Sequence, residues 1–121
     1  MEPSVAYRID TPEGAVVISG EPRVCDEVQA LSAGASLLVH EAIRGHLLAG
    51  TPYAAIVDYH ADSRKLGAMA ARSGVPRLAL THLIPPPSDG GAGFVEDIRA
   101  GGCVGEVTVC NDLDRFVLGG V

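Results

Sequence analysis

Residues 37–42 read Leu-Leu-Val-His-Glu-Ala, and this stretch decides the fold class more clearly than any other. Its three apolar residues predict a short buried strand at 37–39, and a histidine and a glutamate follow directly. Similar short strands are predicted at 15–18 and 77–81, and segments with helical spacing separate the three. Such an alternation of strands and helices favours a layered α/β domain whose central strands are parallel and covered on both faces.

The segments around this centre complete the prediction. Residues 5–9 alternate apolar and polar side chains, and a Pro- and Gly-containing turn at 10–14 joins them to the strand at 15–18 in a hairpin. Residues 43–50 are expected to be part loop and part helix. The other expected elements are helices at 25–33, at 62–73 (with Asp62 as N-cap and Gly74 after the end) and at 94–100, and final strands at 105–109 and 115–118.

The composition sets limits on the function. The chain has 121 residues, a net charge of −6 and 47% hydrophobic residues, so we expect one folded domain over residues 1–121. No apolar run approaches the ~18–20 residues of a membrane span. Because residues 1–4 lack a basic and an apolar region, we expect no secretion signal. The acidic balance argues against a nucleic-acid binder for this chain alone. Three cysteines without C-x-x-C spacing indicate reduced thiols and a cytoplasmic location.

Residues suited to metal or proton chemistry follow three of the predicted strands. The strand at 15–18 leads to Glu21, the strand at 37–39 to His40 and Glu41, and the strand at 77–81 to His82. His60 stands just before the helix that begins near Asp62. Because open α/β sheets bind ligands beyond the carboxyl ends of their strands, these side chains form a candidate site. Histidine and carboxylate are the usual ligands of hydrolytic zinc.

Spacing alone leaves simpler roles open for the same residues. His40 fits a hydrogen-bonded structural histidine, and Glu41 fits a partner for a nearby cation. Asp62 fits a helix cap, and Cys25 on an apolar helix face fits core packing.

Taken together, the segments resemble the C-terminal half of a metallo-β-lactamase-fold hydrolase of the ribonuclease Z-like kind. Residues 15–21 resemble the strand that leads into that family's Gly-Asp-Thr turn, and residues 37–42 are similar to its His-Glu-Ala-Thr segment. Residues 60–63 resemble its His-Ser-Thr segment, and residues 78–83 resemble its final Thr-His strand. All four segments occur in the family's order between about residues 5 and 118.

The resemblance implies specific roles. Glu21 stands at the position of the carboxylate that bridges two metal ions, usually zinc, and His82 stands at the position of a histidine ligand. Glu41 and His60 stand at positions that assist proton transfer or contact the scissile phosphate. The implied activity is metal-dependent hydrolysis of a phosphodiester or another ester bond.

The chain also departs from the family pattern. Glu21 replaces an aspartate, Pro22 replaces the following threonine, and Ala61 replaces the serine beside His60. The family's main ligand motif, His-x-His-x-Asp-His, is absent from these 121 residues. Because a catalytic zinc generally needs three protein ligands, we expect little or no activity from the isolated chain. The alternative is a non-enzymatic, dimeric binding or scaffold module derived from the same fold.

The implied fold is half of an αββα sandwich, with one mixed sheet covered by helices. The family packs a second sheet against the first, so the chain is expected to leave one sheet face apolar and open. An exposed apolar face of that size predicts association. We expect either a homodimer or a separate N-terminal half to bury it.

Overall fold

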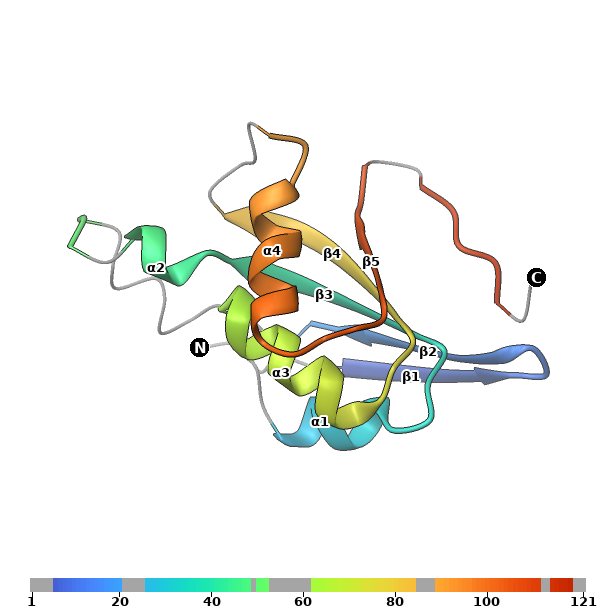
Figure 1. Cartoon of the computed structure of the whole chain (residues 1–121). Helices are drawn as coiled ribbons and strands as arrows, with labels where there is room; N and C mark the ends of the chain where they lie inside the picture. Colours follow the sequence, from blue (N-terminus) through green and yellow to red (C-terminus); the bar gives the residue numbers. More distant parts are fainter. Residues whose placement is uncertain are drawn as a thin grey trace.

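The computed structural model describes residues 6–20, 26–48, 50–52, 62–84, 89–111 and 114–118. Within these ranges the chain forms one mixed sheet of five strands and four helices (Figure 1). In this part of the chain, the structure contains no helix that is long and apolar enough to cross a membrane.

The sheet follows the chain in order, from β1 at one edge to β5 at the other. β1 and β2 pair antiparallel through a tight turn, which confirms the predicted hairpin, and each later strand is parallel to its neighbour. Parallel neighbours need a crossover connection, and the apolar helical segments supply it. The strands are β1 (Ala6–Thr11), β2 (Gly14–Ser19), β3 (Leu37–Ile43), β4 (Arg77–Ile84) and β5 (Glu106–Val109).

Three helices share one face of the sheet. Figure 1 shows α3 and α4 side by side across the strands, with α1 next to α3. A fourth short helix, α2, follows the end of β3. The helices are α1 (Asp26–Ser32), α2 (Gly45–Leu48), α3 (Ser63–Ser73) and α4 (Ala92–Ala100).

Both ends of α3 are formed as the sequence predicts. The Asp62 carboxylate accepts a hydrogen bond from the Lys65 amide at 3.2 Å and so satisfies one of the free donors of the first turn. Gly74 adopts a left-handed conformation with φ of 74°, and its amide donates to the carbonyls of the last turn. Glycine takes this conformation without strain, and so it ends the helix.

Helices α3 and α4 pack closely against each other, and glycines lie at the contact. A Cβ atom at Gly67 would overlap the carbonyl oxygen of Ile98, and one at Gly101 would overlap the carbonyl oxygen of Arg64. The backbones therefore approach to a distance that no other residue type would permit without a shift.

The core lies between this helical layer and the sheet. Leu38, Leu78 and Leu80 project from the central strands, with relative exposures of 1% or less. Successive strand residues point to opposite faces of the sheet. The neighbours of these core residues along each strand therefore lie on the second face, away from the helices. The core cluster is Ala15, Val17, Val28, Ala35, Leu38, Ala42, Leu66, Met69, Ala70, Val75, Leu78, Leu80, Phe94, Ile98 and Cys103.

The exposed large apolar side chains of the second face lie at its hairpin end. Tyr7, Ile9 and Ile18 have relative exposures of 62%, 50% and 43%. At the centre of the same face, Leu37 and Ala79 are buried at 3% and 0%. The expectation of an open face therefore holds for the β1–β2 end and is wrong for the centre. Within the described residues, α1, α3 and α4 cover one face of the sheet, and a covering partner for the other face stays a prediction.

Two predicted strands are longer than expected, and one does not form. β3 continues past residue 39 to Ile43, and β4 continues past residue 81 to Ile84, so their polar residues lie inside the strands. Residues 115–118 form no strand. The Val117 carbonyl instead accepts a hydrogen bond from Arg77 Nη1 at 2.9 Å, and the Arg77 guanidinium lies 5.4 Å from the centre of the Phe116 ring. The Arg77 side chain therefore takes the carbonyl that would pair with a neighbouring strand if residues 115–118 formed one.

Candidate functional site

Two of the predicted site residues lie on neighbouring strands, near the carboxyl ends of both. Glu41 of β3 pairs in register with Thr81 of β4, so His82 stands one residue further along the adjacent strand. The pairing confirms that the strands carrying Glu41 and His82 are neighbours, and it does not test the roles of the two residues. The other two predicted residues, Glu21 and His60, lie outside the described residues.

His82 forms a bulge in β4. Glu41 pairs with Thr81 and Ala42 pairs with Leu83, so His82 is an extra residue between two consecutive pairs. Its φ of 46° is the one positive value among the described non-glycine residues, and its side chain is exposed. A non-glycine residue rarely adopts this conformation, and bulges often redirect a side chain next to a functional site.

His40 and Glu41 point to opposite faces of β3. His40 is fully buried on the helical side, whereas Glu41 is half-buried on the second face. The Nδ1 atom of His40 lies 2.9 Å from the carbonyl oxygen of Glu41. Because a carbonyl oxygen only accepts, this geometry assigns the proton to Nδ1 and the ring lone pair to Nε2 in the neutral form. The structural role left open for His40 agrees with this burial.

The described residues do not assemble a complete metal site. Within the part of the chain that the structure describes, no three side chains of His, Cys, Asp or Glu converge closely enough to hold an ion. His82 is the one implied ligand within the described residues, and a typical catalytic zinc has three protein ligands.

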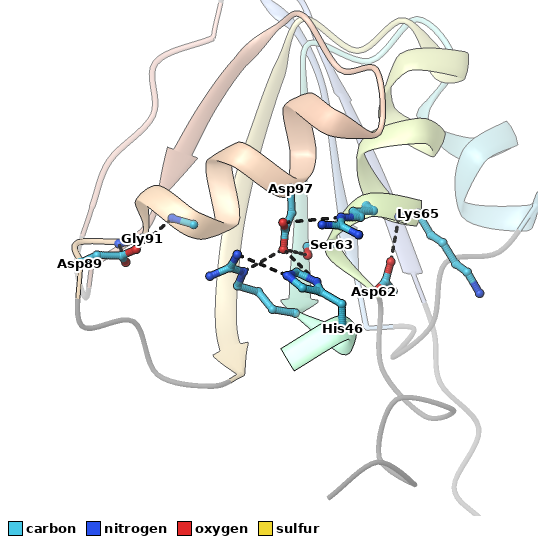
Figure 2. A network of polar contacts seen from close by, with 10 residues as sticks. His46, Asp62, Ser63, Lys65, Asp89, Gly91 and Asp97 are labelled. Atoms are coloured by element: carbon cyan, nitrogen blue, oxygen red, sulfur yellow. Dashed lines mark hydrogen bonds and ion pairs between the residues drawn. The ribbon is translucent and has the colours of Figure 1, made fainter. Parts of the chain in front are cut away.

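A polar network that the sequence pattern did not predict is centred on Asp97 (Figure 2). Asp97 projects from α4 with a side-chain exposure of 3%. Its Oδ2 atom accepts hydrogen bonds from Arg44 Nε at 2.8 Å and from Ser63 Oγ at 2.7 Å. Arg44 follows β3 and Ser63 is the first residue of α3, so one carboxylate joins three elements.

Two further basic groups surround the same carboxylate. His46 Nδ1 and Arg64 Nε each lie 3.7 Å from an Asp97 oxygen, and Arg44 Nη2 lies 3.5 Å from His46 Nε2. Burial by itself raises the pKa of Asp97, but the hydrogen bonds from Arg44 and Ser63 and the nearby positive charge outweigh it and hold the pKa below its usual value. The Asp97 hydrogen bond in turn raises the pKa of the Arg44 guanidinium.

Two features at the start of α4 border this network, the glycine Gly93 and the cap residue Asp89. A Cβ atom at Gly93 would overlap the Arg44 guanidinium, so a larger residue there would require the arginine side chain to shift. Asp89 accepts hydrogen bonds from the amides of Gly91 at 3.0 Å and Gly93 at 3.1 Å, as Figure 2 shows for Gly91. These backbone hydrogen bonds lower the pKa of Asp89.

The sequence contains a sign of the buried charge. Phe94, Asp97 and Ile98 stand at helical spacing i, i+3 and i+4, so the carboxylate shares the apolar face of α4. A charged residue on such a face is rarely buried without a partner. The partners themselves cannot be identified from spacing, because they stand 34 and 53 residues away in the chain.

Comparisons with known proteins confirm the resemblance to ribonuclease Z-like proteins. The chain is 34% identical over 116 residues to "Ribonuclease Z" of Mycobacterium bovis (strain BCG / Pasteur 1173P2), a match that covers 93% of this chain and 41% of that protein. "Ribonuclease Z" of Mycobacterium marinum is 31% identical, with 93% and 42% covered. No protein-family profile matches the chain.

The fold comparison points to the same class. The structure resembles the metallo-β-lactamase fold protein YhfI from Bacillus subtilis with a TM-score of 0.68 and 23% sequence identity, over 87% of this chain and 40% of that one. The chain therefore has the fold of part of a metallo-β-lactamase-fold protein. Its particular sequence similarity is to ribonuclease Z, and it spans about two-fifths of the curated relatives described above.

Proposed function

We propose that this chain supplies part of a metal-dependent hydrolase of the ribonuclease Z kind, which cleaves a phosphodiester or another ester bond. The observation that carries the proposal is the pairing of β3 with β4, which brings Glu41 beside the bulged, exposed His82. The similarity to ribonuclease Z over nearly the whole chain supports the same assignment.

In this proposal His82 and Glu21 bind the metal, which we take to be zinc, and Glu41 and His60 assist proton transfer or contact the scissile phosphate. A bound zinc supplies a water of lowered pKa as the nucleophile. Because the described residues do not complete a zinc site, the proposal requires further ligands from a segment that these described elements do not include. The cytoplasm, where thiols stay reduced, is the proposed location.

The proposed partner is a second sheet-bearing segment. Tyr7 pairs directly with Ile18, and Ile9 pairs with Val16, so these two cross-strand pairs place apolar side chains together on the second face. We call these four residues the hairpin patch. The relatives extend well beyond the matched region. We propose that a segment from this additional length covers the hairpin patch.

The test compares the chain alone with the chain joined to the unmatched part of the M. bovis ribonuclease Z. We expect zinc-dependent hydrolysis of bis(4-nitrophenyl) phosphate by the joined protein and little or none by the isolated chain. His82→Ala should abolish the activity. Lys65→Ala, an exposed substitution in α3, is the matched control and should leave it unchanged.

Two results would contradict this proposal. A joined protein that binds zinc and folds but hydrolyses no ester would contradict the hydrolase function. Zinc-dependent turnover by the isolated chain, abolished by His82→Ala, would contradict the claim that it needs a second segment.

The hairpin patch favours a second candidate function, a non-enzymatic dimeric binding or scaffold module. In that case two copies would bury the patch against each other, with two-fold symmetry. Sedimentation of the isolated chain as a stable monomer would overturn the dimer. Metal analysis separates the two functions, because two zinc ions per joined chain are expected only for the hydrolase.

A further inference from the structure

Asp97 is a buried carboxylate, and its charge is expensive to remove from water unless it is paired. With 3% of its side chain exposed, it receives two short hydrogen bonds on one oxygen and lies beside two more basic groups. The cost of burial is therefore offset only while Arg44 and Ser63 keep their present positions.

Those two partners are themselves fixed to the sheet. The Arg44 amide donates to the Ile84 carbonyl at 2.9 Å, which ties the residue after β3 to the end of β4. Ile43, the last residue of β3, forms an isolated parallel bridge with Asp62, the N-cap of α3. Two connections, one through backbone and one through Asp97, thus hold the beginning of α3 against the end of β3.

The network is more important for the placement of Ser63 than for the packing of α3 against α4. Gly67 and Gly101 already permit close backbone packing of α3 against α4, and Leu66 and Ile98 are fully buried around it. Replacement of a buried charged cluster by apolar residues is often neutral or stabilising, so such clusters are weak evidence for a role in stability. The network adds a hydrogen bond of defined direction that fixes the Ser63 side chain.

We propose that Asp97 is a positioning residue, which sets the start of α3 relative to the end of β3, the strand that carries Glu41. In sequence, Glu41 stands three residues before Arg44, and His60 stands three residues before Ser63. The inference rests on the proposed function, because the two residues that Asp97 holds follow the proposed proton-transfer residues closely in sequence. Asp97 itself does not touch the substrate.

The first test uses the joined protein and Asp97→Asn, which keeps the shape of the side chain and removes its charge. By analogy with residues that orient metal ligands from behind, we expect kcat to fall about 10–100-fold. KM and zinc content should stay unchanged, because neither Asp97 nor the two groups that it hydrogen-bonds is a proposed metal ligand. Asp10→Asn is the matched control, since the exposed Asp10 forms its ion pair with Arg8 in β1, and it should change kcat less than twofold.

The second test uses the 121-residue chain and measures amide hydrogen exchange. In Asp97→Asn, exchange should become faster at residues 44–47 and 62–66 and stay unchanged in the central sheet. Ser63→Ala, which removes one hydrogen bond and keeps the ion pair with Arg44, should give a smaller change at the same sites. If Asp97→Asn fails to fold, Ser63→Ala alone tests whether the network fixes the start of α3.

The outcomes are distinguishable. An unchanged kcat in an active joined protein would overturn the inference, and so would unchanged exchange at both segments. Faster exchange throughout the sheet would also overturn it, because it would indicate a merely structural role. A wild-type joined protein without activity would overturn the proposed function and with it the catalytic part of this inference, while the exchange measurement would still test the hold on α3.

Discussion

The two faces of the sheet are built from the same strands and have different surroundings. Val17 and Ile18 are consecutive apolar residues of β2, yet Val17 is fully buried under the helices and Ile18 is 43% exposed. Both satisfy the same strand pattern. The difference shows that alternation assigns each residue to a face, whereas burial depends on what the rest of the chain packs against that face.

The largest effect is expected in the core of the helix-covered face. Ile98→Ala removes a fully buried side chain from α4 and should lower the free energy of unfolding by about 2–5 kcal/mol. Ile18→Ala on the second face is the matched control and should cost less than about 1 kcal/mol, because much of that side chain is already in water. Urea denaturation of both variants measures the difference. Equal losses would show that Ile18 is covered in solution.

The glycine contact between α3 and α4 provides the second prediction. Gly67→Ala should destabilise the chain by about 1–3 kcal/mol, because the new methyl group must displace the Ile98 backbone. In an exposed helix the same change normally stabilises by up to about 1 kcal/mol. Ala71→Gly, an exposed position in the same helix, is the reverse control and should cost about that amount. A stabilised Gly67→Ala variant would contradict the close approach.

The third prediction concerns acid stability. The folded-state pKa of Asp97 is below its unfolded value, so the unfolded chain binds more protons in that interval and stability falls as pH falls. The contribution is fully present above the ordinary aspartate pKa of about 3.9 and is lost as pH falls through the folded pKa. Thermal unfolding should therefore show a steeper acid loss below about pH 4 in the wild type than in Asp97→Asn. Parallel curves would contradict the paired, ionised state.

The smallest effect on stability is expected in the hairpin patch. Ile9→Lys should change the free energy of unfolding of the monomer by no more than about 0.5 kcal/mol, because the side chain is half exposed. It should weaken any association of the chain, which sedimentation at increasing concentration measures. Val117→Lys is the control, since Val117 is more exposed and lies outside the patch. Equal weakening by both variants would show that the patch is not the contact.

Much of the fold was predictable because it depends on local patterns. The β1–β2 hairpin and both ends of α3 follow from turn residues, alternation and capping chemistry within a few positions. The meeting of Glu41 with the His82 strand was also predictable, since parallel strands place their carboxyl ends at one edge. The bulge at His82 was not predictable, because it is a mismatch in register between two strands.

The sequence by itself determined the fold class, the order of apolar strands and capped helices, and the resemblance carried by four short segments. These are properties of neighbouring residues, and spacing along the chain is enough to specify them. Only the tertiary structure decided which sheet face is buried, where His82 leaves the strand register, and that Asp97 joins Arg44 to Ser63. Each of these depends on contacts between residues far apart in the chain, whose energies exist only once the elements have packed.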